Sequence, residues 1–154
     1  MSLETLILAA GKGTRMKSKV PKVLHKVGGK PMLQHVIDAA KKAGSSREVV
    51  VIGSGAELVE KSISDVEFVM QAEQLGTGHA VLSAEKNFAE SKGTVLILCG
   101  DTPLLTGELL KNFVETHEGS TCAATVLTAK MPDATGYGRI IRDTDGEFKK
   151  IVEE

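Results

Sequence analysis

The sequence has 154 residues, the length of one domain with its own core, so we expect residues 1–154 to form a single domain. Apolar residues make up 42% and charged residues 25%, which excludes disordered and fibrous proteins. With 3% aromatic residues, a net charge of −1 and no apolar stretch approaching about 18 residues, the chain fits neither a nucleic-acid-binding nor a membrane-spanning protein.

The net charge conceals an uneven distribution of basic residues. Seven basic and no acidic residues lie between residues 5 and 37, so the other 12 basic residues are outnumbered by 20 acidic ones. Because this basic block begins in a glycine-rich loop, it favours an anionic ligand there. Cys99 and Cys122 lie inside apolar runs and no secretory signal precedes them. We therefore interpret both as buried thiols of a cytoplasmic protein.

Apolar runs and turn signals predict strands and helices in alternation. Strands are expected over 4–9, 47–52 and 67–71, helices over 31–43, 56–63 and 79–89, and a loop over 10–29. A strand over 94–99 then leads to a helix over 107–117 and to strands over 121–129, 139–142 and 148–152. This order predicts an α/β fold with a Rossmann-like, mostly parallel sheet, helices on both faces and an antiparallel β element near the C-terminus. Ligands of such sheets bind beyond the carboxyl ends of the strands.

The loop after the first strand reads Leu8-Ala9-Ala10-Gly11-Lys12-Gly13-Thr14-Arg15-Met16. A dinucleotide fingerprint would need glycine where Met16 stands and an acid where Gly53 follows the second strand, and no Walker lysine is present. What remains is a glycine loop whose amides can converge on an anion beside Lys12 and Arg15. Pro21 then restricts the backbone before Lys22, whose ammonium could hold a phosphate.

Two further segments follow strand ends. Asp101 comes directly after the strand over 94–99, where one carboxylate together with substrate phosphates suits Mg²⁺, or where it could organise the Asp-Thr-Pro turn. The stretch Q-A-E-Q-L-G-T-G-H-A begins with Gln71, whose amide can pair with a base edge. Thr77 in this stretch could equally cap a helix. His79 has no acid beside it, so we interpret it as a structural histidine.

Five motifs together resemble the sugar-nucleotide pyrophosphorylase family: L-A-A-G-K-G-T-R-M, P-K-V-L, Q-A-E-Q-L-G-T-G-H-A, G-D-T-P-L and G-Y-G-R-I. Their order and spacing cover residues 6–153. The glutamine-led motif most specifically resembles the uridyltransferase domain of the bacterial bifunctional N-acetylglucosamine-1-phosphate uridyltransferase/glucosamine-1-phosphate acetyltransferases. The resemblance implies transfer of UMP from UTP to N-acetylglucosamine 1-phosphate, with pyrophosphate released and Mg²⁺ as the cofactor.

The resemblance also implies roles for individual residues. Arg15 and Lys22 would handle the phosphates as catalytic residues, Asp101 would ligate the metal, and Gly138 and Glu153 would contact the sugar. The residues implied to contact the nucleotide are Leu8, Ala10, Gly11, Gln71, Gly76 and Thr77. In-line attack on a phosphate needs positioning and charge neutralisation rather than a protein nucleophile, which agrees with the absence of a Gly-x-Ser-x-Gly elbow from the sequence.

The chain also departs from the family pattern. Family members continue with two asparagines, one for the sugar and one for the metal, and with an acetyltransferase β-helix domain, none of which has a counterpart here. We therefore expect a nucleotidyltransferase domain that is incomplete at its C-terminal end and has weak or no activity alone. A nucleotide-binding module without catalysis, a related cytidylyl-, thymidylyl- or guanylyltransferase, and a homo-oligomer all remain open.

Overall fold

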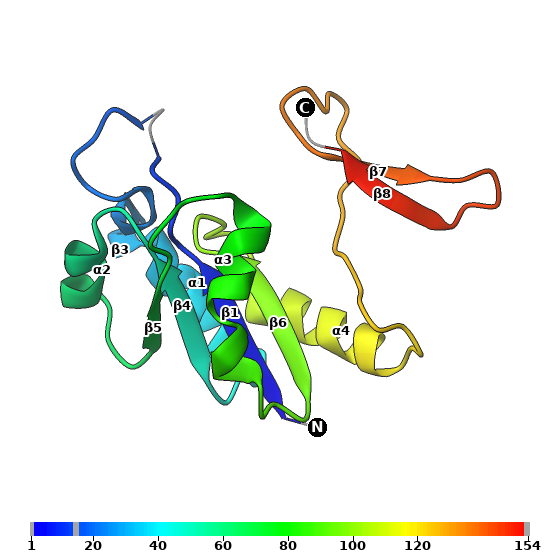
Figure 1. Cartoon of the computed structure of the whole chain (residues 1–154), viewed down its shortest axis with the longest axis horizontal. Coiled ribbons are helices and arrows are strands. Elements are labelled where there is room, and N and C mark those ends of the chain that lie inside the picture. Colours follow the sequence, from blue (N-terminus) through cyan, green and yellow to red (C-terminus); the bar gives the residue numbers. More distant parts are fainter. Residues whose placement is uncertain (1, 14–15, 153–154) are drawn as a thin grey trace. The chain divides into compact units, whose positions relative to one another are not determined.

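The computed structural model describes residues 2–13 and 16–152, and the chain falls into two compact units, Met1–Ala123 and Ala124–Glu154. The first unit is built on a four-stranded sheet. Its strands are β1 (Leu3–Leu8), β4 (Glu48–Ile52), β5 (Glu67–Met70) and β6 (Thr94–Cys99), in the order β5-β4-β1-β6 (Figure 1). Every pairing in this sheet is parallel. The predicted α/β fold is confirmed.

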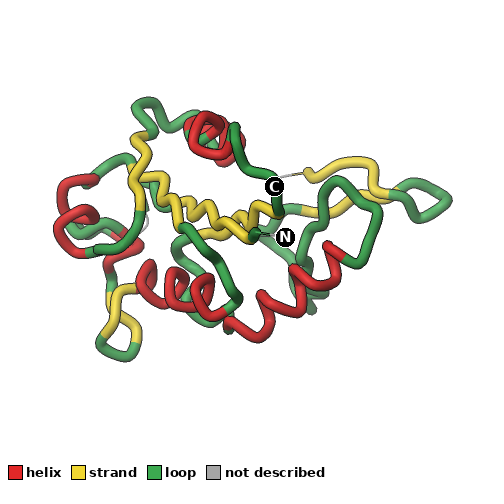
Figure 2. The backbone as a smooth tube through the Cα atoms, turned by 90° about the horizontal axis from the view of Figure 1, so that it is seen from below, coloured by secondary structure: helices red, strands yellow, loops and turns green. Residues whose placement is uncertain are grey.

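Helices cover both faces of the sheet (Figure 2). Successive residues of β1 point to opposite faces: Ile7 packs in one core cluster, whereas Leu6 packs in a second one. The first cluster takes residues from α1 (Met32–Lys42), α2 (Ala56–Ser62) and α4 (Gly107–Glu118), and the second from α3 (Thr77–Ser83). Strand β4 is buried along its whole length, as expected for a central parallel strand. Within the described residues, no helix has the length and apolar composition of a membrane span.

Helix α1 forms because its apolar residues recur at helical spacing. Leu33, Val36, Ile37 and Ala40 are fully buried and line one side of the helix, which faces the sheet. The helix ends before Gly44, whose backbone has a φ of 98° and so adopts a conformation that glycine favours at helix ends.

The structure corrects two local expectations in the first unit. The segment over 10–29 is not loop throughout: it holds a short 3-10 helix, η2 (Lys22–Leu24), and the start of a small hairpin, β2 (Lys26–Val27) with β3 (Lys30–Pro31), that turns at Gly28 and Gly29. The helix expected over 79–89 begins earlier and is shorter, because α3 gives way to the 3-10 helix η3 (Glu85–Phe88). The Ser83 hydroxyl donates to the His79 carbonyl oxygen near this point, a side-chain bond that competes with regular helix.

The second unit contains an antiparallel hairpin, β7 (Arg139–Arg142) with β8 (Phe148–Val152), as predicted. The strand expected over 121–129 is wrong, since these residues form neither helix nor strand and are exposed. An apolar, β-branched run becomes a strand only when another strand pairs with its backbone, and none of the described strands pairs with this stretch.

The interpretation of the cysteines as buried is also wrong. Cys99 and Cys122 are free thiols and both are exposed. Cys99 ends β6 and lies with Ile97 on the exposed face of that strand, whereas Leu98 on the opposite face is buried. Cys122 lies in the stretch over 121–129, which pairs with no described strand. Apolar neighbours in the sequence indicate neither which face of a strand is exposed nor whether a segment pairs with another strand.

The core assignment leads to a stability prediction. Leu110 on α4 is 1% exposed, whereas Leu82 on α3 is 64% exposed. We expect Leu110→Ala to lower the free energy of unfolding by about 2–5 kcal/mol, because it leaves a cavity in the core, and Leu82→Ala to change it by less than about 0.5 kcal/mol. Urea denaturation followed by circular dichroism measures both, and equal losses in the two variants would contradict the assignment.

Candidate functional site

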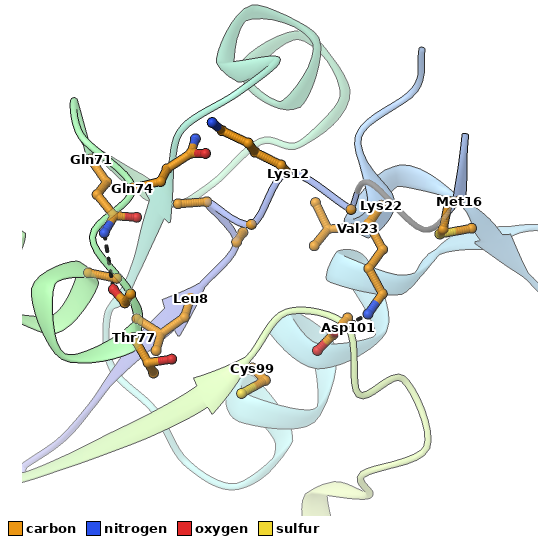
Figure 3. Close-up of a pocket in the computed structure, with 16 residues that line it drawn as sticks. Leu8, Lys12, Met16, Lys22, Val23, Gln71, Gln74, Thr77, Cys99 and Asp101 are labelled. Atoms are coloured by element: carbon orange, nitrogen blue, oxygen red, sulfur yellow. Dashed lines mark hydrogen bonds and ion pairs between the residues drawn. The ribbon is translucent and has the colours of Figure 1, made fainter. Parts of the chain in front are cut away.

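A pocket of about 540 Å³ lies at the carboxyl ends of the parallel strands (Figure 3). This is the position at which open α/β sheets bind their ligands. Of the residues assigned to the site from sequence, the pocket is lined by Leu8, Ala10, Gly11, Lys22, Gln71, Gly76, Thr77 and Asp101. These residues come from four separate parts of the chain, which the parallel sheet brings to one edge.

Close backbone approaches shape the floor of the pocket. The end of β1 is held between its neighbours, because the Ala9 amide donates to the Val51 carbonyl oxygen at 2.8 Å and the Gly100 amide donates to the Leu8 carbonyl oxygen at 2.9 Å. A Cβ atom at Gly53 would lie 2.9 Å from the carbonyl oxygen of Ala10, nearer than real Cβ atoms come. The close packing requires glycine at position 53, which is the position at which a dinucleotide-binding protein would carry its acidic residue.

One end of the pocket is charged. Lys22 Nζ lies 2.5 Å from Asp101 Oδ2, although the two residues are 79 positions apart in the chain. Lys22 is the first residue of η2 and follows Pro21, whose backbone (φ −50°, ψ 139°) fixes the direction in which the chain enters the helix. Gly13 leaves room for the lysine stem, since a Cβ there would lie 2.8 Å from Lys22 Cβ. The two side chains are 38% and 33% exposed, so water screens the pair to within about 1 kcal/mol. An anionic ligand can therefore readily replace Asp101 beside Lys22, and a cation can readily replace Lys22 beside Asp101.

Asp101 does not organise the turn that follows β6. The Thr102 hydroxyl closes that turn by donating to the Cys99 carbonyl oxygen at 2.7 Å, while the Asp101 carboxylate points to Lys22 (Figure 3). Among residues 2–13 and 16–152, no group of three His, Cys, Asp or Glu side chains could hold a metal by itself. One carboxylate on a pocket wall suits Mg²⁺, which keeps several waters and takes other ligands from substrate phosphates.

The other end of the pocket carries amide groups. Gln71 is 4% exposed, and its Nε2 lies 3.2 Å from the carbonyl oxygen of Gly76. Gly76, with a φ of 101°, is the cap residue of α3, so Thr77 is not the cap; it is the first residue of the helix and lines the pocket. Gln74, which sequence reasoning left without a role, also lines the pocket, and its buried Oε1 accepts no hydrogen bond within the described structure. Its position three residues after Gln71 in the same motif was the available signal.

Cys99 is a further lining residue that sequence reasoning missed. Partial burial of the sulfur, followed by the negative charge of Asp101, raises the pKa of the Cys99 thiol, while Lys22 opposes the shift. At neutral pH the group is therefore a thiol and not a thiolate nucleophile. The charged and amide side chains that line the pocket therefore suit chemistry that depends on positioning and charge.

The pocket described above tests none of the roles assigned to Arg15, Gly138 and Glu153. Arg15 and Glu153 lie outside the described residues, and Gly138 immediately precedes β7 in the second unit. Their proposed roles remain predictions from the motifs.

Comparison with known proteins gives consistent matches. A family model described as a MobA-like NTP transferase domain matches residues 5–139. A curated relative, "Bifunctional protein GlmU" of Shouchella clausii, is 56% identical over 149 residues, which cover 96% of this chain and 33% of the relative. The chain spans about a third of the length of the curated relatives it matches.

Solved structures share the fold. A putative glucose-1-phosphate thymidylyltransferase from Bacillus anthracis, in complex with a sucrose, matches with a TM-score of 0.79 at 20% identity, over 99% of this chain and 64% of that one. A UDP-glucose pyrophosphorylase complexed with UDP-glucose matches with a TM-score of 0.74 at 21% identity, over 99% and 69% of the two chains. Together with the family match over most of the chain, the parallel sheet and the glycine loop at its edge lead to one conclusion: the chain belongs to the MobA-like NTP transferase domain family.

Proposed function

We propose that this chain forms the UTP-binding part of a uridyltransferase that transfers UMP to N-acetylglucosamine 1-phosphate and releases pyrophosphate. The observation that carries the proposal is one pocket with two chemically different ends, an amide end at Gln71 and a charged end at Lys22 and Asp101. A nucleoside triphosphate has a matching arrangement of groups, with a hydrogen-bonding base at one end and phosphates at the other. The choice of substrates follows the motif resemblance to the uridyltransferase domain, and the UDP-glucose bound by a solved pyrophosphorylase of the same fold supports a uridine nucleotide.

The proposed reaction is a direct displacement. An oxygen of the sugar phosphate attacks the α-phosphorus of UTP, a new P–O bond forms, and the bond to the bridging oxygen of the β-phosphate breaks with its electron pair leaving on pyrophosphate. Such a step requires the reactants to be held in line and their charges offset, and it requires no protein nucleophile. A pocket in which the Cys99 thiol stays protonated, and so provides no thiolate nucleophile, is consistent with such a step.

The residues divide this work between them. Lys22 would leave Asp101 and hold the phosphates with its ammonium group, and the amides of the loop at Ala10 and Gly11 would approach the nucleotide closely. Asp101 would then hold Mg²⁺, which when bound offsets phosphate charge. The proposal keeps Arg15 at the phosphates and Gly138 and Glu153 at the sugar on the strength of the motifs alone. It also keeps a cytoplasmic location, because nucleoside triphosphates are made and used inside the cell.

The first test is nucleotide selectivity. We expect UTP with Mg²⁺ to raise the melting temperature of this chain more than CTP or GTP does at equal concentration, because binding to the folded state stabilises it. Thermal shift over a concentration series measures the apparent affinities. A larger shift with CTP or GTP would overturn the assignment of uridine and favour a related nucleotidyltransferase.

The second test separates an enzyme from a binding module. We expect any pyrophosphate release by the purified chain to be weak and to require UTP, Mg²⁺ and N-acetylglucosamine 1-phosphate together, as measured in a coupled phosphate assay. Glucose 1-phosphate serves as the control acceptor. UTP binding with no release above the protein-free rate would contradict catalysis by this chain and favour the binding module.

The third test addresses the charged end. We expect Lys22→Ala to weaken binding of UTP by about tenfold or more, since it removes the cation that faces the phosphates. Lys26→Ala is the matched control, because Lys26 belongs to the same basic block and does not line this pocket.

Titration with UTP also tests the role of Asp101. Asp101→Asn should reduce the gain in UTP affinity that Mg²⁺ produces, whereas Asp65→Asn, on the surface, should preserve it. Isothermal titration calorimetry with and without Mg²⁺ measures these affinities. Equal behaviour of Lys22→Ala and Lys26→Ala would remove the phosphate assignment, and an undiminished metal effect in Asp101→Asn would remove the metal assignment.

A further inference from the structure

His79 lies behind the pocket and not in its wall. It is the third residue of α3, is partly buried, and is absent from the residues that line the pocket. Its ring makes one contact that reaches the site, because Nδ1 lies 3.0 Å from Nε2 of Gln71. Among the described residues, Gln71 is therefore the link between this imidazole and a ligand in the pocket.

The hydrogen bonds determine which groups donate and which accept. A carbonyl oxygen can only accept, so the Gln71 amide atom 3.2 Å from the Gly76 carbonyl oxygen must be the nitrogen, which donates. The second hydrogen of that same nitrogen is then directed to His79 Nδ1. Nδ1 must accept it, so the imidazole is neutral and carries its proton on Nε2.

The same bonds orient the rest of the glutamine amide. With both Nε2 hydrogens engaged, Gln71 has only its carbonyl oxygen left to offer, and Figure 3 shows that oxygen on the side that faces the pocket. Rotating the amide by 180° would place an oxygen against both the Gly76 carbonyl oxygen and the unprotonated Nδ1. Because Gln71 is buried, the unpaired groups would be costly, and the amide stays in one orientation.

An acceptor held in this way distinguishes between pyrimidines. Uracil presents an N–H donor at N3, whereas cytosine has an unprotonated acceptor at N3. We propose that His79 is a positioning residue: it holds the Gln71 amide so that the carbonyl oxygen meets the base, and thereby makes the site select uracil over cytosine. This inference rests on the proposed uridine nucleotide site and assigns part of its selectivity to a residue that contacts no substrate.

The test compares two substitutions of similar size. His79→Asn keeps an acceptor near the position of Nδ1, because an Asn side-chain oxygen can take the place of that ring nitrogen, whereas His79→Leu fills the space without an acceptor. The measured quantity is the ratio of the dissociation constants for CTP and UTP, each with Mg²⁺, by isothermal titration calorimetry. We expect His79→Leu to lower this ratio by about fivefold or more, corresponding to the loss of one orienting hydrogen bond. We expect His79→Asn to keep it within about twofold.

A second measurement on the wild-type chain needs no variant. Long-range ¹H–¹⁵N NMR of the imidazole reports which ring nitrogen carries the proton, and we expect a neutral ring protonated on Nε2 and unprotonated on Nδ1.

The outcomes separate this inference from the proposed function. A preference for UTP in the wild type that persists unchanged in His79→Leu would overturn the role of His79 and leave the uridine site standing. Loss of the preference in both variants would mean that the ring acts through packing alone, which also overturns it. A wild type with no preference for UTP overturns the base assignment itself. A proton on Nδ1 overturns the positioning role whatever the affinities show.

Discussion

The parallel pairing of β1 between β4 and β6 is the constraint on which the rest of the first unit depends. Parallel strands end at the same edge of a sheet, so the segments that follow β1, β5 and β6 converge although they lie far apart in the sequence. The glycine loop, the glutamine motif and Asp101 meet there for this reason. Helices on both faces bury the strands and so hold this register in place.

Close approach of backbones is the second requirement of the site. Gly53 and Gly13 stand where a Cβ atom would meet Ala10 or the stem of Lys22. The glycines thus let the loop after β1 lie against its neighbours, with Lys22 directed across the pocket toward Asp101. The result is a binding surface in which backbone, amide and charged groups occupy separate parts of one cavity.

Much of the first unit could be predicted from residue patterns. Strands β1, β4 and β6 are short apolar runs, α1 has a helical stripe, and glycines mark the loop. The predictions that were wrong depend on tertiary contacts: a pattern shows that a segment can form a strand, for example, and only a partner strand decides whether it does. The run over 121–129 pairs with no described strand. Cys99, like Ile97, lies on the exposed face of β6, which an uninterrupted apolar run does not reveal.

The sequence by itself determined the alternation of strands and helices, the basic glycine loop, and the residue types available to meet a nucleotide. Only the tertiary structure decided which of these residues face one another. The Lys22–Asp101 ion pair and the orientation of Gln71 by Gly76 and His79 depend on strand order and on distances between side chains. Local periodicity reports which face of an element is buried. It carries no information on which strand edges adjoin, and that adjacency brings the two ends of the pocket together.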